Sequence, residues 1–380
     1  MTQCESNSGP DAARGVAYGR GRVAIIYGTR PEIIKLAGLA GRLGERALLI
    51  HTGQHFDSSM SRDIAVQAGL PEPELQLAVG GLSRAAQIAT ALGVLDQALG
   101  RQPVDAVVVQ GDTNTAVAGA LAANALRIPL VHVEAGLRSY DRAMPEEHNR
   151  VVIDHLADLL CAPTSGSVDN LAREGITGDR VALTGNTVVE AVRQSLPAET
   201  HRQKVLREFG LAADQYVLAT IHRPENTDAA GTLARILEQL ATLPLRVVLP
   251  LHPRTETAVG RFGLRRSLAG MRVLPPVDPR TFLSLAAHAA VLVSDSGGIQ
   301  EECTVIGRPL IVVRRSTERP EALRDFARLT PAGHGLAAAV SDVLLQGPGL
   351  LKHLAALPSP FGDEFAADHI LHAMAGKALL

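Results

Sequence analysis

Short apolar runs recur along the chain, and each is followed by a polar or glycine-containing segment and then by a stretch that favours a helix. The runs are rich in Val, Ile, Leu and Ala, as the buried strands of a parallel sheet are. Strands that alternate with helices form a parallel sheet with helices on both faces, and ligands bind beyond the carboxyl ends of the strands. We therefore predict an α/β protein. The predicted strands are residues 23–27, 47–50, 106–109, 130–133, 159–161, 181–183, 216–220, 246–250, 272–274, 291–294 and 309–313.

The apolar pattern stops at a polar stretch, residues 195–207, and then restarts. A chain of 380 residues also exceeds the size at which one hydrophobic core usually stops growing. We therefore predict two domains with a cleft between them and a boundary near residues 186–192. The predicted parts are a flexible tail over residues 1–21, a first domain over 22–188, a second domain over 189–362 and a final helix over 363–380.

The composition limits the kind of partner. Hydrophobic residues make up 46% of the chain and charged residues 20%, with a formal net charge of -2. These values are typical of a compact protein without a broad surface for nucleic acid or anionic membranes. Aromatic content is 3% with no Trp, so the stacking platforms of single-stranded nucleic-acid binders are missing. The expected partner is a small molecule, with no nucleic acid and no membrane.

Further signals bear on redox chemistry, metals and location. Cys4, Cys161 and Cys303 have no paired spacing for zinc or redox chemistry, and no H-E-x-x-H motif occurs, so no catalytic metal is expected. The N-terminal stretch lacks the apolar core of a signal peptide. No apolar run approaches the ~20 residues that a membrane span needs. We expect a cytoplasmic protein.

Two strand ends have the features of an anion site. Residues 294–298 (SDSGG) lead from a strand into a helix, where free N–H groups and the helix dipole favour a diphosphate, although a turn glycine alone would also explain them. Residues 28–31 (GTRP) add Arg30 to a second helix start, and a surface salt bridge is the alternative for this side chain. Two such sites in different domains predict one anionic ligand clamped between them.

Three carboxylates follow successive strand or loop ends of the first predicted sheet. Asp112 is either a helix N-cap or a catalytic carboxylate. Glu134 stands before Ala-Gly and is poorly explained by capping. Glu146 opens a predicted helix, where an acid also interacts well with the helix dipole. The ends of neighbouring parallel strands share one edge, so all three can reach one rim.

The second predicted domain places more polar residues after its strands. His222 is either a buried, hydrogen-bonded imidazole or a site residue that titrates near neutrality or donates to phosphate. His252 ends the next strand in the same way. Residues 317–321 follow the last predicted strand and offer a carboxylate and the guanidinium of Arg319 to the cleft.

Together these segments resemble the non-hydrolysing UDP-N-acetylglucosamine 2-epimerases of bacteria and archaea, from Val23 to about Ala373. The resemblance implies a GT-B architecture, in which two Rossmann-like domains face a central cleft. It also implies that the C-terminal helix crosses back onto the first domain and that two copies form a homodimer. The matching segments are residues 28–32 with Lys35, 54–55, 111–113, 132–138, 145–150, 185–187, 222–223, 294–302 and 317–321.

The resemblance also implies residue roles. The catalytic acid and base carboxylates would be Asp112, Glu134 and Glu146, with His222 assisting. Gln54 and His55 match positions that the family uses for a second, activating UDP-N-acetylglucosamine molecule. Residues 277–282 would contact the uracil. The remaining substrate-binding positions are Arg30, Lys35, Arg150, His252, Ser296, Gly297, Gly298, Glu302 and Arg319.

The implied reaction interconverts UDP-N-acetylglucosamine and UDP-N-acetylmannosamine. Departure of UDP from C1 acidifies the C2–H bond, loss of that proton gives a 2-acetamidoglucal, and a proton returns from the opposite face. Donors aimed at the departing diphosphate would stabilise its developing charge. Acids crowded beside a diphosphate should raise at least one pKa towards neutrality. Such a reaction needs neither NAD nor a metal.

Other functions fit parts of the pattern. They are a 2-epimerase of a modified UDP-sugar, a hydrolysing relative that releases N-acetylmannosamine, a GT-B glycosyltransferase and a catalytically silent nucleotide-sugar sensor. A glycosyltransferase would share the fold and the diphosphate clamp but would not need three acids on one rim. The SGGIQEE segment, residues 296–302, favours the non-hydrolysing branch. Fold alone does not separate these functions.

Overall fold

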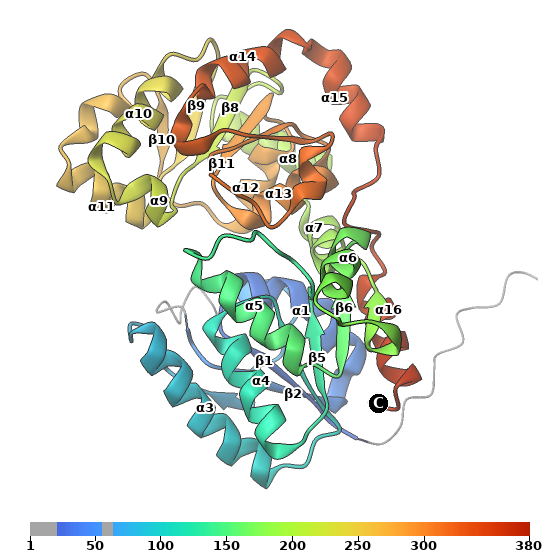
Figure 1. Cartoon of the computed structure of the whole chain (residues 1–380). Helices are drawn as coiled ribbons and strands as arrows, with labels where there is room; N and C mark the ends of the chain where they lie inside the picture. The colour runs from blue at the N-terminus through green and yellow to red at the C-terminus, as the bar shows by residue number, and fades with distance from the viewer. Residues whose placement is uncertain (1–20, 55–63) are drawn as a thin grey trace, which may run out of the picture.

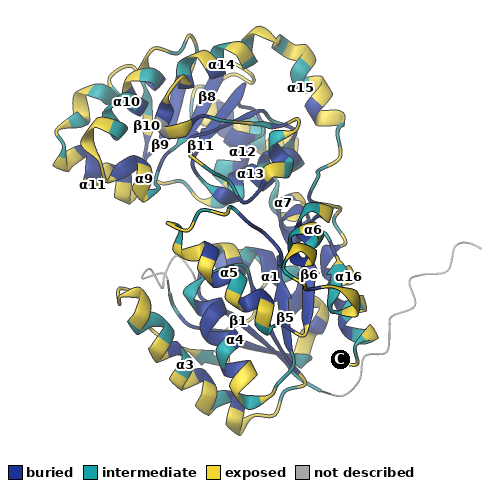
Figure 2. Ribbon diagram, in the orientation of Figure 1, coloured by how far each residue is buried: buried dark blue, intermediate teal, exposed yellow. Residues whose placement is uncertain are grey.

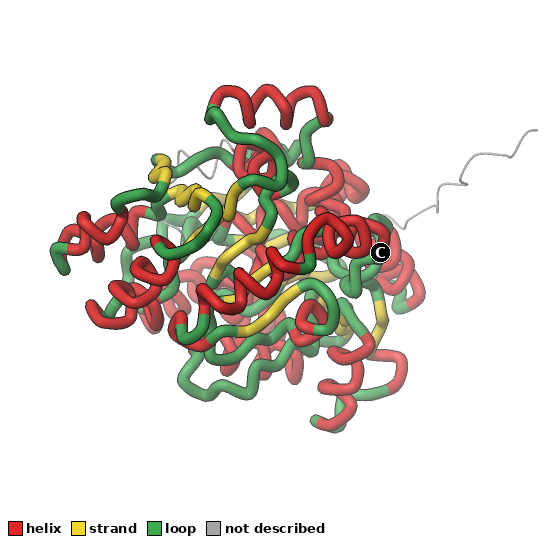
Figure 3. The backbone as a smooth tube through the Cα atoms, turned by 90° about the horizontal axis from the view of Figure 1, so that it is seen from above, coloured by secondary structure: helices red, strands yellow, loops and turns green. Residues whose placement is uncertain are grey.

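The computed structural model describes residues 21–54 and 64–380, which form two α/β units (Figure 1). Each unit contains one parallel sheet, and helices surround the strands (Figure 3). The predicted tail lies outside the described residues, apart from Gly21. In the part of the chain that the structure describes, no helix is long and apolar enough to cross a membrane.

The first unit is built on a 7-stranded sheet in which neighbouring strands run parallel. Its strand order is β3 (Leu75–Gln76), β2 (Ala47–His51), β1 (Val23–Tyr27), β4 (Ala106–Gln110), β5 (Leu130–Val133), β6 (Leu159–Ala162) and β7 (Val181–Leu183). Its helices are α1 (Arg30–Leu43), α3 (Arg84–Arg101), α4 (Asn114–Leu126), α5 (Pro145–Leu156), α6 (Ser165–Arg173) and α7 (Thr187–Ser195).

The second unit repeats this architecture on a 6-stranded parallel sheet. Its strand order is β10 (Arg272–Leu274), β9 (Arg246–Pro250), β8 (Tyr216–Thr220), β11 (Val291–Ser294), β12 (Leu310–Val312) and β13 (Ala327–Leu329). Its helices are α8 (Glu199–Glu208), α9 (Pro224–Thr227), α10 (Ala230–Ala241), α11 (Pro253–Arg261), α12 (Pro279–Ala286), α13 (Gly297–Ile306), α14 (Leu336–Leu345) and α15 (Gly347–Ala356).

Apolar side chains cover both faces of the first sheet, so its inner strands are buried, whereas the edge strands β3 and β7 are partly exposed (Figure 2). Alternate residues of β1 point to opposite layers: Ile26 packs in the layer that contains residues of α3 and α4, and Ile25 packs in the layer that contains residues of α1. The last helix, α16 (Ala366–Gly376), contributes Ile370 and Leu371 to the second layer. The end of the chain therefore packs in the core of the first unit (Figure 1).

The strand order reverses between adjacent central strands in both sheets. In the first sheet β1 and β4 are neighbours, and in the second β8 and β11 are neighbours. The loops that leave these pairs run to opposite sides, which opens a crevice at the carboxyl ends of the strands. The loops that begin at residues 28, 111, 221 and 295 lie at these ends and carry many of the predicted site residues.

Glu32 links two of these loops. It lies in the first turn of α1, where its Oε2 accepts hydrogen bonds from the backbone N–H groups of Gly28 at 3.0 Å and Thr29 at 2.7 Å. Its Oε1 accepts a bond of 2.7 Å from the hydroxyl of Thr113, next to Asp112. Burial outweighs these hydrogen bonds and raises the pKa of Glu32 from an ordinary value of 4.5 to about 7.

The raised pKa of Glu32 predicts a pH-dependent stability. The folded protein holds this proton more tightly than the unfolded chain, so the contribution of Glu32 is complete below pH 4.5 and is lost as the pH rises through about 7. The wild-type free energy of unfolding should therefore fall across this window by about 3 kcal/mol relative to Glu32→Gln. Urea denaturation at several pH values measures the difference, with Glu45→Gln as an exposed control. Parallel curves for wild type and Glu32→Gln would contradict the prediction.

Candidate active site

Charged side chains of the two units meet in a buried ionic cluster. Glu134 directly follows β5, and its side chain is only 3% exposed. Its carboxylate accepts hydrogen bonds from Lys35 Nζ at 2.6 Å and from Arg319 Nη2 at 2.9 Å, and Gln110 Nε2 donates to it as well. Lys35 lies on α1 of the first unit, whereas Arg319 belongs to the second unit. The carboxylate of Glu134 therefore joins the two units.

The backbone of Glu134 is strained. Its φ of 70° lies in the left-handed region, which is sterically unfavourable for a residue with a β-carbon. Such a conformation costs roughly 1–3 kcal/mol and persists where the surrounding structure holds it, often at functional sites. The hydrogen bonds to the Glu134 carboxylate supply that support.

Glu301 on α13 is the second carboxylate of the cluster. It accepts a 2.7 Å hydrogen bond from Arg319 Nε, and its Oε2 forms a 2.9 Å ion pair with Lys35 Nζ. Asn186, at the start of α7, donates to the same carboxylate at 2.9 Å. Lys35 and Arg319 thus each bridge Glu134 and Glu301.

The two carboxylates have opposite pKa shifts. Burial, with a further contribution from Glu301, raises the pKa of Glu134 despite the nearby cations. Burial also acts on Glu301, but Arg319 and Lys35 outweigh it and lower its pKa. Burial opposes the charge on Lys35, yet the two carboxylates together raise its pKa. Neighbouring acids with separated pKa values are typical of sites that transfer protons.

Asp112 lies on the neighbouring turn, between β4 and α4, and its side chain is 25% exposed. Its carboxylate forms an ion pair with Arg150 of α5, and its backbone carbonyl accepts a 2.7 Å hydrogen bond from Asn149. Arg150 also contacts Glu147 at 2.9 Å. The structure therefore brings Asp112 and Arg150 together beside the cluster.

The two glutamates at the start of α5 differ in environment. Glu146 is exposed, and no hydrogen bond or ion pair among the described residues joins it to the cluster. Glu147 is buried and accepts hydrogen bonds from the backbone N–H groups of Ser139 at 3.0 Å and Tyr140 at 2.8 Å. Glu147 thus holds the loop before α5, whereas Glu146 faces solvent.

The start of α13 presents the glycines of the predicted diphosphate site. Ser296 is the N-cap residue, and no side chain of the described residues caps the helix there. A β-carbon on Gly297 would lie 2.9 Å from Arg319 Nη1, so glycine permits the close approach of that guanidinium. Gly298 is partly exposed in the first turn. The first N–H groups and the helix dipole together favour an anion at this end.

Glu302 lies one residue beyond Glu301 on α13 and is partly exposed. Burial of its carboxyl group, followed by the charge of Glu301, raises the pKa of Glu302 to about 7. The structure therefore places Glu302 beside the cluster, near the glycines at the start of the helix.

His222 follows β8 and is oriented by Asp295, which is fully buried after β11. Asp295 accepts hydrogen bonds from the backbone N–H groups of His222 at 3.0 Å and Arg223 at 2.9 Å. The carboxylate also lies 3.2 Å from His222 Nδ1. Burial outweighs Asp295 and lowers the pKa of His222, so a neutral imidazole is favoured.

His252 lies beside His222, and the charge of Arg30 from the first unit acts on His252. The centres of the His222 and His252 rings are 5.1 Å apart. Burial, then His222 and, to a smaller extent, Arg30 lower the pKa of the exposed His252. Arg30 is the first residue of α1, so its charge acts across the interface between the units.

Of the two predicted activator residues, Gln54 lies within the described part of the chain and contacts the start of α4. Gln54 Oε1 accepts hydrogen bonds of 2.9 Å from both the backbone N–H and the hydroxyl of Thr115, in the first turn of α4. A β-carbon on Gly28 would lie 2.2 Å from the Thr115 hydroxyl oxygen, so the adjacent turn requires glycine. His55 lies outside the described residues.

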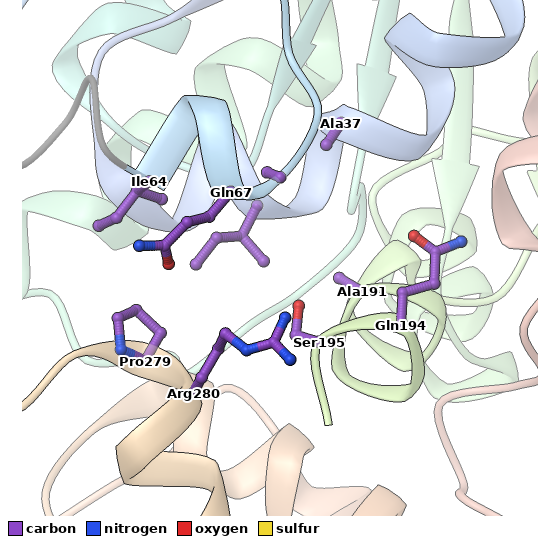
Figure 4. A pocket seen from close by; sticks show the side chains of 10 residues that line it. Ala37, Ile64, Gln67, Ala191, Gln194, Ser195, Pro279 and Arg280 are labelled. Atoms are coloured by element: carbon purple, nitrogen blue, oxygen red, sulfur yellow. The ribbon is translucent and has the colours of Figure 1, made fainter. Parts of the chain in front are cut away.

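Helices of the two units also line an open pocket of about 90 Å³ (Figure 4). Ala37 of α1 and Ala191 of α7 line it from the first unit, and Pro279 and Arg280 line it from the start of α12. This start of α12 belongs to the segment 277–282, for which the family resemblance implies contact with uracil. The segment therefore faces the first unit across the pocket.

Sequence patterns missed several members of the site. Glu301 lies one helical turn after Gly297, so helical spacing could have placed it on the same face. Residues 317–321 are predicted to offer a carboxylate to the cleft, but the sequence does not distinguish Glu318 from Glu321. In the structure Glu318 contacts Arg314 Nη1 at 3.0 Å and also pairs with Arg319. Gln110 and Asp295 are buried by tertiary packing, which local patterns do not reveal.

Comparison with known proteins identifies the family. A family model described as UDP-N-acetylglucosamine 2-epimerase matches residues 42–375. A UDP-N-acetylglucosamine 2-epimerase of Methanococcus maripaludis is 38% identical over 312 residues, which cover 80% of this chain and 85% of that protein.

Solved structures agree with this result. The UDP-GlcNAc 2-epimerase of Methanocaldococcus jannaschii, in complex with UDP-GlcNAc and UDP, is 35% identical with a TM-score of 0.84, covering 93% of this chain and 99% of that chain. The Neisseria meningitidis UDP-GlcNAc 2-epimerase bound to UDP-GlcNAc is 30% identical with a TM-score of 0.84, covering 93% and 100%. The two parallel-sheet units and these likenesses confirm the predicted GT-B-like architecture with Rossmann-like units. The chain belongs to the UDP-N-acetylglucosamine 2-epimerase family.

Proposed function

We propose that this protein interconverts UDP-N-acetylglucosamine and UDP-N-acetylmannosamine without net hydrolysis. The observation that carries the proposal is the strained, buried Glu134, held by Lys35 and Arg319 at the interface of the two units. Asp112 on the next turn supplies another carboxylate. The names of the similar proteins support the same substrate.

The UDP moiety would bind at the anion-favouring residues of both units. The start of α13, with Ser296, Gly297 and Gly298, offers backbone N–H groups to the diphosphate, and Arg30 and His222 approach from two further loops. Glu302 would accept hydrogen bonds from the ribose. These donors stabilise the negative charge that develops on UDP as its bond to C1 breaks.

The chemical steps need proton transfer at C2. The C1–O bond breaks with both electrons leaving on UDP, and a carboxylate then takes the C2 proton to give a 2-acetamidoglucal. Return of a proton to the opposite face of C2 and attack of UDP on C1 complete the exchange of epimers. Burial raises the pKa of Glu134, so this carboxylate takes up a proton more readily than an ordinary glutamate, and Asp112 would be the second proton-transfer group.

The remaining groups have supporting roles in this proposal. Lys35 and Arg150 orient the two carboxylates, Arg319 and His252 extend the cationic surface for the sugar diphosphate, and Glu146 supplies a third carboxylate at the exposed rim. Four further expectations stay predictions. They are the activator site at Gln54 and His55, the homodimer, the cytoplasmic location and the use of the product in a cell-envelope polysaccharide. The domain limits at residues 188, 189 and 362 also stay predictions.

Product analysis tests the proposed reaction. With UDP-N-acetylglucosamine as the sole substrate, chromatography should show UDP-N-acetylmannosamine accumulating to a constant ratio of the two nucleotide sugars. Free UDP should remain a minor species, because the intermediate is consumed by re-addition. Stoichiometric release of UDP and N-acetylmannosamine would instead show hydrolysis, and an unchanged substrate would contradict the proposal.

Substitution of the two carboxylates separates proton transfer from binding. Asp112→Asn and Glu134→Gln should each lower kcat by a factor on the order of 10²–10⁴, because each removes a proton-transfer group. Calorimetry should show UDP affinity within a few-fold of wild type, since the proposed diphosphate contacts remain. Asp169→Asn, on the exposed face of α6, is the matched control. Near-normal kcat in both variants would exclude these roles.

A further inference from the structure

A buried histidine lies behind the two proposed catalytic turns. His132 is the third residue of β5 and is 0% exposed. Its Nδ1 lies 2.7 Å from Oδ1 of Asp154, and its Nε2 lies 2.8 Å from the backbone carbonyl oxygen of Gly111. Both ring nitrogens therefore face hydrogen-bond acceptors.

The partners determine the protonation of this ring. A neutral imidazole has one N–H group and one nitrogen lone pair, whichever tautomer is present. In either tautomer the lone pair would point at a carboxylate or a carbonyl oxygen in a buried site, which is unfavourable. Only the imidazolium, with both nitrogens protonated, donates to Asp154 and to Gly111 at once.

Asp154 is the counter-ion of this ring. It lies on α5, is 0% exposed, and accepts a 2.7 Å hydrogen bond from Arg138 Nη1 through its other oxygen. Burial would raise the pKa of Asp154, but His132 and Arg138 outweigh it and lower the pKa. Arg138 is paired in turn with Glu174 at 2.6 Å. His132, Asp154 and Arg138 thus form a buried network, which ends at the partly exposed Glu174.

This network forms hydrogen bonds with both turns that carry the proposed catalytic carboxylates. The Gly111 carbonyl, bound by His132, immediately precedes Asp112. The backbone N–H of Gly136, two residues after Glu134, donates to Asp154 Oδ2 at 3.2 Å. Both glycines have positive φ, 66° and 82°, so each turn bends sharply where the network holds it.

We propose that His132 is a positioning residue, which as a buried imidazolium on Asp154 sets the placement of Asp112 relative to Glu134. His132 has no exposed surface and therefore does not touch the substrate. It acts through the Gly111 carbonyl and Asp154. The proposal rests on the proposed roles of Asp112 and Glu134 for its catalytic consequence, whereas the charge of the ring can be measured separately.

Nitrogen-15 NMR of histidine-labelled protein tests the charge directly. The His132 signals, assigned by their loss in His132→Gln, should show both ring nitrogens protonated at neutral pH. One unprotonated ring nitrogen, in either tautomer, would overturn the proposal. This measurement does not depend on activity, so it stands even if the enzyme fails to epimerise UDP-N-acetylglucosamine.

Two variants test the positioning. In His132→Gln the amide N–H can still donate to Gly111, but the amide oxygen then faces the Asp154 carboxylate. We expect kcat to fall on the order of a hundredfold, with UDP affinity unchanged, because misplacement of a catalytic group by about 1 Å has an effect of this size. In the double variant, which combines His132→Gln with Asp154→Asn, kcat should be at least tenfold higher than in His132→Gln alone. The asparagine N–H can donate to the glutamine oxygen.

The control is His155→Gln, an exposed neighbour on α5, which should leave kcat, UDP affinity and the melting temperature unchanged. A merely structural role for His132 would lower the melting temperature and UDP affinity together, without recovery of kcat in the double variant. That outcome, or full activity in His132→Gln, would overturn the positioning role.

Discussion

The site depends on two cations at the interface of the two units, each of which forms ion pairs with the same two carboxylates. Lys35 and Arg319 both contact Glu134 of the first unit and Glu301 of the second. Their charges are buried, so removal of one partner would leave an unpaired buried charge at a cost of about 3–5 kcal/mol. The four side chains are therefore stable only as a set, and the set exists only when the two units are together.

This constraint links assembly of the site to its chemistry. Contact between the two units buries both carboxylates, which strengthens their interactions with Lys35 and Arg319. Burial raises the pKa of Glu134, whereas the two cations lower that of Glu301. The same contact also brings Arg30 of the first unit towards the histidines of the second. The proposed glucal intermediate would form where the ionic cluster already limits access of solvent.

Local sequence patterns predicted the strands and domains more completely than they predicted the side-chain contacts within the site. Continuous apolar runs identified the buried strands, because both faces of each sheet are covered by helices. They missed β3 and β13, since Leu75–Gln76 and Ala327–Leu329 are short and partly exposed. Glu134 could be singled out because capping did not explain it. Gln110 and Asp154 could not, since their environment is created by segments far apart in the chain. Helical spacing from Gly297 could have placed Glu301 on the same face of α13, but it does not reveal that Lys35 and Arg319 meet Glu301 there. The turn before α5 shows the same limit: sequence alone did not indicate which of Glu146 and Glu147 would be buried.

The most direct test of the central claim follows the proton on C2. Proton NMR of UDP-N-acetylglucosamine in D₂O, with the wild-type enzyme and with Glu134→Gln, measures replacement of the C2 hydrogen by deuterium. If Glu134 exchanges this proton within the closed cluster, the wild-type enzyme will place deuterium at C2 of both epimers, and the variant will do so far more slowly. Epimerisation that retains the C2 hydrogen, or equally fast exchange in Glu134→Gln, would contradict the account.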